Sequence, residues 1–572
     1  MTRAKDTSRT VSLEPAPVTM HDAASEPIDA AGLSPFAPSH ARSDLSELVL
    51  PAEPPEIAEA PDETLPSWRP LYERAAFPLL ITIAIYAAAR SVALAVTKHL
   101  WFDEIATQVV SRQRDLSAIW AALKTGADGN PPPFYLIERA AAALPLDEHI
   151  AYRLPSILAL PFTLICLYLF VRRNDGPVRA FVSACVLLLS QIYTWFAAEA
   201  RPYSLLMACV AFALLCYQRA GRRRWAFGLF ISLALAMSLH YYALFVFVPF
   251  VAAELTLTWR TRRPRLTVWL ALLASLAPLA IFWKLLTSTR AIYGAHLWSS
   301  PHLQWQTVLA SYSNYFGTQE PWGWALAGLC CGAIVLCLWR GTPGEAFSAE
   351  LDDAHEHVLA LGFLFMPAIG FLGADVAHGG IVPRYCLSAV FGVALGVRCL
   401  LRPWRGRTVL GAAAFILFVV AVQEIGFWSS PDRHTPPGNA ATSLQSLVSS
   451  AHRDDLPNDL PVIVADPIAY LEIQHYAAPE LKRRLVDLVD PAKAVEYVQT
   501  DSAERGLLAL RNFVPLNVQD YSDFTASHPA FLLYANHDDY EWTPSRLADD
   551  GAAPRLLVND GSDSLYLVEP AR

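Results

Sequence analysis

Long apolar segments alternate with short polar ones between residues 76 and 427, and this alternation is the strongest pattern in the chain. Most segments approach the roughly 20 residues that an α-helix needs to cross the hydrocarbon core of a bilayer. The pattern predicts a polytopic α-helical membrane protein with about eleven transmembrane helices. The predicted segments lie near 76–97, 153–171, 179–197, 202–218, 225–239, 241–258, 266–286, 322–339, 358–377, 384–401 and 408–427.

Arginines are unevenly distributed among the loops that join these segments. Loops 172–179, 219–224, 260–265 and 402–407 contain 3, 4, 4 and 3 arginines, and the alternate turns 197–203, 239–242 and 378–385 contain one, none and one. Cytoplasmic loops of membrane proteins carry the excess of positive charge. We therefore expect a multi-pass protein of the inner (plasma) membrane, with its N-terminus in the cytoplasm and its C-terminus on the extracytoplasmic side.

The polar ends of the chain differ in character. Residues 1–72 hold 11 of the 42 prolines without a sustained apolar period, which predicts a disordered cytoplasmic tail. Residues 73–430 form the predicted transmembrane part, with outer loops at 98–152 and 287–321. In residues 431–572, short apolar runs alternate with helical stretches, which favours a small extracytoplasmic α/β domain. The predicted strands are 462–466, 485–489, 531–535, 555–560 and 564–570.

Composition supports the membrane assignment and excludes one function class. Of the 572 residues, 54% are apolar and only 17% are charged, against about 25% charged residues in soluble domains. The net charge of -9 provides no basic field for nucleic acid, so we expect no nucleic-acid partner. All nine cysteines lie in or beside apolar runs, where a free cysteine is typically a small packing residue.

Asp103 and Glu104 are adjacent carboxylates at the point where the first predicted helix leaves the membrane. Partial burial there would raise the pKa of a carboxyl group toward a value useful for a general base. The same residues are also typical of an interfacial anchor followed by first-turn acids that stabilise a helix N-terminus. The residues alone leave both interpretations open.

Three further outer turns carry candidate charges. Glu199 and Arg201 can pair in one turn, and Arg201 can instead meet an anion at the membrane surface. His240, in the next turn, is either a packing residue or a ligand-binding one. Arg384 can hold a lipid phosphate or anchor a helix end. Arg90, within the first helix, is a functional candidate that can also snorkel outward.

In order and spacing, the outer motifs resemble the GT-C membrane glycosyltransferases, in particular the bacterial branch of the dolichyl-phosphate-mannose protein mannosyltransferase and aminoarabinose transferase family. The resemblance covers roughly residues 70–430, and the order of the motifs is its specific part. The matching pieces are WFDE at 101–104, NPPPFY at 130–135, YRLPSIL at 152–158, EARPYSLL at 199–206, HYYALF at 240–245 and PRY at 383–385.

The resemblance implies a transferase that moves a sugar from a polyprenyl-phosphate donor to an acceptor hydroxyl, with inversion at the anomeric carbon. It implies catalysis by Asp103 as general base, with Glu104 beside it in the same motif. Family members often carry a lysine before the paired prolines, where this chain has Asn130. In the matching motifs we place the substrate-binding residues Asn130, Glu199, Arg201, Tyr203, His240, Tyr241, Arg384 and Tyr385.

We expect no cofactor and no obligatory metal ion, because the lipid-phosphate sugar is already activated. The chain has no GxxxxGK[ST] phosphate loop, and Asp352 and Asp353 fall in a predicted cytoplasmic loop. The acceptor is an unidentified envelope glycan, lipid or protein. Two other functions are compatible with a membrane protein that has many helices and a few charged residues. One is a polytopic transporter or lipid flippase, and the other is a binding or assembly protein whose exported tail recruits partners.

Overall fold

The computed structural model describes residues 69–293, 304–340, 353–377, 380–429, 440–451, 457 and 459–569. The chain divides into two units, Met1–Thr64 and Leu65–Arg572, and every described residue belongs to the second. Most of the predicted tail therefore lies outside the described residues, as do residues 378 and 379. The first helix, α1, begins at Arg69, inside the range predicted as tail.

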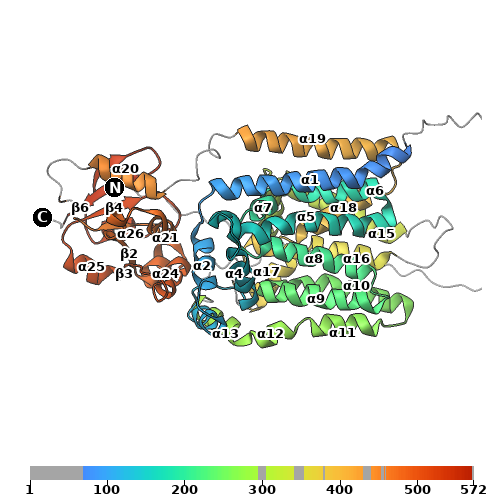
Figure 1. Ribbon diagram of the computed structural model, residues 1–572, viewed down its shortest axis with the longest axis horizontal. Coiled ribbons are helices and arrows are strands. Elements are labelled where there is room, and N and C mark those ends of the chain that lie inside the picture. The colour runs from blue at the N-terminus through green and yellow to red at the C-terminus, as the bar shows by residue number, and fades with distance from the viewer. Residues whose placement is uncertain are drawn as a thin grey trace, which may run out of the picture. The chain divides into compact units, whose positions relative to one another are not determined.

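Helices occupy all eleven segments predicted to cross the membrane (Figure 1). Five of them are long and apolar enough to span a bilayer, and seven if each of two bent helix pairs counts as one span. The protein is therefore a multi-pass membrane protein, while the figure of eleven crossings stays a prediction. The helices at these segments are α1 (Arg69–Thr97), α5 (Glu148–Asp175), α6 (Pro177–Val186), η1 (Leu187–Leu189), α7 (Gln191–Phe196), α8 (Tyr203–Gln218), α9 (Arg223–Leu239), η2 (Tyr241–Val246), α10 (Phe247–Thr261), α11 (Leu266–Ala274), α12 (Ala277–Ile281), α13 (Trp283–Tyr293), α15 (Trp322–Arg340), α16 (Ala354–Leu364), α17 (Met366–Ala377), η3 (Pro383–Cys386), α18 (Ala389–Leu401) and α19 (Arg407–Ser429).

Two predicted spans are broken. The segment 266–286 divides into α11, α12 and α13, and α13 is bent by 58° from the part before it. The segment 358–377 divides into α16 and α17 with a bend of 60°. Pro278 and Pro367 lie in the first turns of α12 and α17. A proline has no N–H, which a helix does not need in its first turn, but the preceding helix cannot continue through it because that hydrogen bond is missing.

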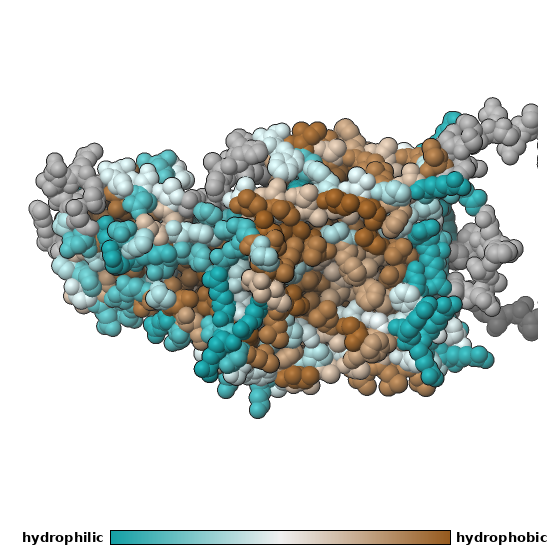
Figure 2. Space-filling model, viewed as in Figure 1, coloured by the Kyte–Doolittle hydropathy of each residue, from teal (hydrophilic) through white to brown (hydrophobic). Residues whose placement is uncertain are grey.

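The surface of the helical part carries a hydrophobic belt between hydrophilic rims (Figure 2). On α19, Phe415, Phe418 and Ile425 are each more than 60% exposed, which is typical of side chains that face lipid. Between α1 and α5, three shorter helices fold at one end of the bundle. They are α2 (Phe102–Ser111), α3 (Leu116–Lys124) and α4 (Pro132–Ala142), and α14 (Trp305–Phe316) lies in the second predicted outer loop.

The C-terminal part contains a six-stranded sheet of order β3-β2-β1-β4-β6-β5. Strands β3, β2, β1 and β4 pair in parallel, and β6 pairs antiparallel with both of its neighbours, β4 and β5. Five strands lie at the predicted segments. The three-residue strand β3 was not predicted because its Gln519 and Asp520 leave no apolar run. The strands are β1 (Val462–Val464), β2 (Leu485–Val489), β3 (Val518–Asp520), β4 (Phe531–Ala535), β5 (Arg555–Asn559) and β6 (Ser564–Val568).

Alternate residues of the central strands enter two different cores. Val462 and Leu532 belong to the apolar core that is continuous with the helical bundle, whereas Ile463 and Leu533 belong to a separate core with Trp542. Burial on both faces is typical of parallel strands covered by helices. The helices here are α20 (Ala440–Ala451), α21 (Pro467–Tyr476), α22 (Pro479–Lys482), α23 (Pro491–Val498), α24 (Ser502–Leu510), α25 (Tyr521–Ser527) and α26 (Thr543–Asp549).

Candidate active site

The two adjacent carboxylates of the first outer motif point in different directions. Both lie in the first turn of α2, where successive side chains diverge by roughly 100° around the helix. Asp103 lines a cavity and its side chain is 16% exposed, whereas the side chain of Glu104 is fully buried. The geometry therefore separates two residues that the sequence analysis had grouped as catalytic.

Glu104 forms an ion pair with Arg153 of α5, and both side chains have no exposed surface. Arg153 donates its Nε and Nη2 to the two carboxylate oxygens at 2.8 and 2.6 Å. Its remaining donors bind the carbonyls of Ala95, Lys98 and His99 at 2.6–2.9 Å. Burial raises the pKa of Glu104, but the attraction of Arg153 outweighs burial and leaves the pKa below its usual value. Since Glu104 does not reach the cavity and is paired with Arg153, the geometry favours a structural role for it over the predicted catalytic one.

Arg201 lies in the turn between α7 and α8, held among carboxylates of the first outer loop. Its Nη1 donates to Asp128 at 2.8 Å, to the Thr107 hydroxyl at 2.9 Å and to the Asp103 carbonyl at 3.1 Å. Its Nη2 lies 3.7 Å from the Asp103 carboxylate. Burial lowers the pKa of Arg201, but Asp128 and Asp103 outweigh it and raise the pKa well above its ordinary value, so the guanidinium stays charged.

Glu199 does not pair with Arg201, although their spacing allowed it. Its carboxylate instead binds the ammonium of Lys98 at the end of α1, and Lys98 also lies 4.0 Å from the ring centre of Trp195. Glu199 is buried and does not line the cavity, so the geometry favours a structural role for it over the predicted substrate contact. Arg90 likewise has a partner inside the bundle, Glu424 of α19 at 2.9 Å, which replaces outward snorkelling.

Arg384 approaches the same carboxylate oxygen, Asp103 Oδ2, as Arg201 does. It lies in η3, and its Nη2 is 3.9 Å from the Asp103 carboxylate. Next to it, the ring of Tyr385 packs against His240, with centroids 4.9 Å apart. Tyr203 packs behind these two rings and does not line the cavity. The geometry therefore favours a supporting role for Tyr203 over the predicted substrate contact.

A cavity of about 350 Å³ connects these side chains and has the size of a small-ligand site. One side of it is polar and carries charges of both signs, and the other side is apolar and comes mainly from η2, α12, α13 and α17. Seven of the ten predicted site residues line it: Asp103, Asn130, Arg201, His240, Tyr241, Arg384 and Tyr385. The apolar side is formed by Leu244, Phe245, Leu279, Trp283, Leu286, Ala374 and Ala377.

Hydrogen-bond donors without a partner gather around this cavity. Among the described residues, the buried atoms Arg201 Nε, Arg384 Nε, Asn130 Nδ2 and Tyr241 Oη make no hydrogen bond. An unsatisfied buried donor costs roughly 1–3 kcal/mol. Four such donors around one cavity, two of them on cations, constitute a site that complements an anionic ligand rich in oxygen.

The two carboxylates of the cavity differ in their hydrogen bonding. Asp128 accepts from Arg201, from Thr107 at 3.3 Å and from the Gly129 amide at 2.6 Å. Among the residues that the structure describes, the Asp103 carboxylate has only two long ion-pair contacts, to Arg201 and Arg384, and both exceed hydrogen-bond distance. Asp103 is therefore the carboxylate with oxygen lone pairs available to a ligand.

His240 is neutral in this environment. Burial, and then the positive charges of Arg201 and Arg384, lower the pKa of His240 to about 3. Its Nδ1 accepts from the Tyr242 amide at 3.2 Å, which leaves the hydrogen on Nε2. His240 is thus a neutral donor whose tautomer is set by the adjoining turn, and it cannot serve as a cationic clamp.

Several cavity residues were missed in the sequence. Asp128 lies in the loop GADG, between two elements, where a turn carboxylate is common and gives no chemical signal. Arg290 and Tyr293 lie on α13, and both fall in the predicted outer loop 287–321, where no helix was expected. Ser502 and Gly506 come from α24 of the C-terminal part, for which no site residue was predicted.

Comparisons with known proteins agree with the motif resemblance. A family model described as dolichyl-phosphate-mannose-protein mannosyltransferase matches residues 129–286. The structure of ArnT from Cupriavidus metallidurans in the apo state is similar, with 14% sequence identity, 87% of this chain and 98% of that chain covered, and a TM-score of 0.51. The chain therefore has an ArnT-like fold, and its resemblance to this family of GT-C glycosyltransferases is confirmed.

Two other solved structures are more weakly similar. ArnT from Cupriavidus metallidurans bound to undecaprenyl phosphate has 15% identity, coverage of 86% of this chain and 97% of that chain, and a TM-score of 0.48. The Archaeoglobus fulgidus oligosaccharyltransferase in its apo form has 9% identity, coverage of 80% and 69%, and a TM-score of 0.39. No curated protein sequence matches the chain.

Proposed function

From the resemblance to the dolichyl-phosphate-mannose-protein mannosyltransferase family, we propose that this membrane protein transfers a sugar from a polyprenyl-phosphate donor to an acceptor hydroxyl. The reaction takes place on the extracytoplasmic face and inverts the anomeric carbon. The observation that carries the proposal is the set of four unpartnered buried donors around a cavity that also holds an available carboxylate. The family description names a donor of this class, a sugar on a polyprenyl phosphate.

The cavity divides in the way that such a donor requires. The phosphate binds to Arg201 and Arg384, whose guanidinium groups lie 3.7 and 3.9 Å from the Asp103 carboxylate. The lipid chain lies along the apolar side formed by α12, α13 and α17. As the sugar leaves, negative charge grows on the phosphate, and cationic donors already fixed in position stabilise it without reorganising.

Asp103 acts as the general base. It removes the proton of the acceptor hydroxyl as that oxygen attacks the anomeric carbon, and the phosphate leaves from the opposite face. Among the described residues, no group donates a hydrogen bond to the Asp103 carboxylate, whereas the Asp128 carboxylate accepts hydrogen bonds from Arg201 and Gly129; this difference favours Asp103 as the base. General-base assistance of this kind is worth roughly 10²- to 10⁴-fold in rate. No step of this mechanism uses a metal ion or an organic cofactor.

The test compares Asp103→Asn with wild type in purified full-length protein supplied with a polyprenyl-phosphate sugar and envelope extract as acceptor. Release of free polyprenyl phosphate reports turnover, and direct titration with polyprenyl phosphate reports binding. We expect turnover to fall roughly 10²- to 10⁴-fold while binding is retained. The exposed Asp539 provides the matched control, Asp539→Asn, which keeps wild-type turnover. Wild-type turnover in Asp103→Asn contradicts the assignment.

One observation favours the second candidate, a transporter or lipid flippase. Both broken spans, α11–α13 and α16–α17, contribute to the cavity wall, and discontinuous helices beside a binding site are typical of transporters. Vesicles with reconstituted protein and a fluorescent polyprenyl-phosphate sugar separate the functions. Movement between leaflets that is unaffected by Asp103→Asn, without sugar transfer, supports the transporter and refutes the transferase.

A further inference from the structure

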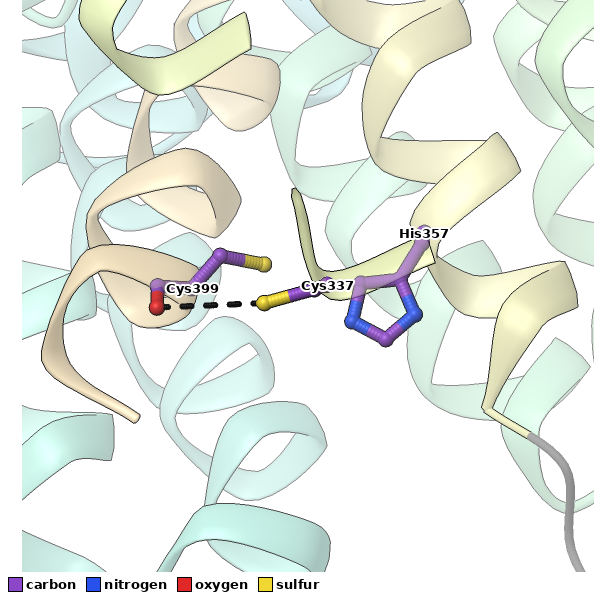
Figure 3. Close-up of side chains that lie close together, drawn as sticks. All are labelled: Cys337, His357 and Cys399. Atoms are coloured by element: carbon purple, nitrogen blue, oxygen red, sulfur yellow. Dashed lines mark hydrogen bonds between the residues drawn. The ribbon is translucent and has the colours of Figure 1, made fainter. Parts of the chain in front are cut away.

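Three soft metal-binding side chains from different helices converge at one end of the bundle. Cys337 of α15, His357 of α16 and Cys399 of α18 place one ligand atom each within 4.8 Å of the others (Figure 3). His357 and Cys399 are only 4% and 3% exposed, while Cys337 is partly exposed. The cluster is therefore held in a packed interior and retains one solvent-accessible member.

Close helix packing explains why the two thiols meet. At Gly396, one turn before Cys399, a Cβ would overlap Cys330, which lies two turns before Cys337 on α15. At Gly392, a Cβ would overlap the backbone of α16 at Leu364. Glycine lets the backbones of the three helices approach closely at these positions. Because these backbones lie close together, Cys337 of α15, His357 of α16 and Cys399 of α18 are within reach of one another.

The ring of His357 already faces a cation. Its Nε2 lies 3.0 Å from Nη1 of Arg402, and since a guanidinium only donates, Nε2 is the unprotonated acceptor and its lone pair is engaged by Arg402. The other nitrogen, Nδ1, is buried and has no partner among the described residues. Arg402 has two further anchors, Asp175 at 2.7 Å and Asp353 at 2.9 Å, so its guanidinium remains held by these carboxylates when Nη1 moves away from the imidazole.

We propose that Cys337, Cys399 and His357 Nε2 bind one Zn²⁺ ion. Zinc bonds of roughly 2.3 Å to sulfur and 2.0–2.1 Å to nitrogen place tetrahedral ligand atoms roughly 3.5–3.8 Å apart, which small side-chain rotations from the observed cluster achieve. On binding, each thiol loses its proton to solvent, Nε2 exchanges the Arg402 contact for the metal, and water takes the fourth position. The thiolate–imidazole ligand set suits zinc better than magnesium or calcium.

This site is independent of the proposed transfer reaction. Cys399 lies near the end of α18, and Arg384 lies just before the start of that helix, in η3. Fifteen residues at a rise of 1.5 Å separate them by roughly 20 Å. The ion would join α15, α16 and α18 at the end of the bundle away from the cavity. Its role is to stabilise the helix packing, so no catalytic step changes.

The first test uses full-length protein in detergent micelles, purified with reductant and without chelator. Zinc content is measured by mass spectrometry, and Co²⁺ added to chelator-treated protein provides a spectroscopic stand-in for zinc. We expect one zinc per chain, a thiolate-to-cobalt charge-transfer band, and loss of that band when Zn²⁺ is added. Cys337→Ser and Cys399→Ser should each weaken zinc binding at least about 10-fold, and His357→Ala should do the same.

The matched control is Cys331→Ser, which removes a partly buried cysteine of α15 outside the cluster and should leave the band intact. A second measurement needs no variant: added zinc should protect the partly exposed Cys337 of the wild type from alkylation and leave Cys331 reactive. Absence of both the band and the protection overturns the proposal. So does a Cys337–Cys399 disulfide in the freshly purified protein, because a disulfide cannot ligate the ion.

Discussion

Replacing Glu104 with glutamine tests whether the second carboxylate of the WFDE motif is structural. Arg153 uses all five of its N–H donors, two of them on the Glu104 carboxylate, and neither side chain is exposed. Glutamine has nearly the same shape but sets an amide N–H against a guanidinium N–H and removes the compensating charge. Breaking a buried ion pair in this way costs about 3–5 kcal/mol of unfolding free energy.

The magnitude is measured as a double-mutant cycle in full-length protein unfolded by denaturant in mixed micelles. Arg153→Met should cost as much as Glu104→Gln, since it leaves a buried carboxylate with only the Ala200 and Trp101 amides as donors. The double variant should be less destabilised than the sum of the single variants, with a coupling of about 2–3 kcal/mol. Asp103→Asn, one residue away, should change stability by less than about 0.5 kcal/mol.

The pH dependence of this pair has a definite sign. Because the folded pKa of Glu104 is depressed, its contribution to stability is present above the unfolded pKa near 4.5 and disappears as the pH falls through the folded value. Glu104→Gln should remove that part of the acid destabilisation. If Glu104→Gln instead keeps wild-type stability and loses turnover as Asp103→Asn does, Glu104 is catalytic and the structural assignment is wrong.

Three further substitutions test other parts of the molecule. Arg384→Lys should weaken binding of polyprenyl phosphate about 10-fold, because lysine lacks the planar fork of donors; unchanged affinity in a direct titration would place the phosphate elsewhere. Burial raises the pKa of Glu504 from 4.5 to about 8, so the folded protein loses stability as the pH rises between these two values. Glu504→Gln should therefore raise the melting temperature at pH 8 more than at pH 5. The exposed Glu480 provides the control substitution, Glu480→Gln. Glu424→Gln should destabilise the protein by about 1.5–3 kcal/mol by releasing α19 from Arg90, and an unchanged denaturation midpoint would contradict the importance of that ion pair.

The sequence predicted where the helices lie, because the hydrophobicity of each apolar segment is a local property that can be read without knowing its partners. It predicted the cluster of outer charges for a similar reason, since Asp103, Arg201, His240 and Arg384 end their segments in turns on the same predicted side. The sequence did not predict which charged side chains form ion pairs with each other. Glu199 lies two residues from Arg201, yet its partner is Lys98, roughly a hundred residues away in sequence.

The cysteines show the same difference between local and long-range information. Cys337 and Cys399 sit in apolar helices with no ligand spacing, so local sequence favours a packing role for each. Only the approach of α15 and α18 at Gly396 brings them together with His357. A ligand set that is assembled across three helices has no signature within any one of them.

The two broken spans connect the fold to the site most directly. Straight helices over 266–286 and 358–377 would carry their side chains past the outer end of the bundle, whereas the bends of 58° and 60° turn α13 and α17 so that both line the cavity. Pro367 lies in the first turn of α17 and cannot donate to the previous turn, which explains the 60° break, whereas Pro278 only separates α12 from α11 and lies before the 58° bend at the start of α13. Pro367 therefore marks, within an apolar segment, the point where α16 ends and the cavity-lining helix α17 begins.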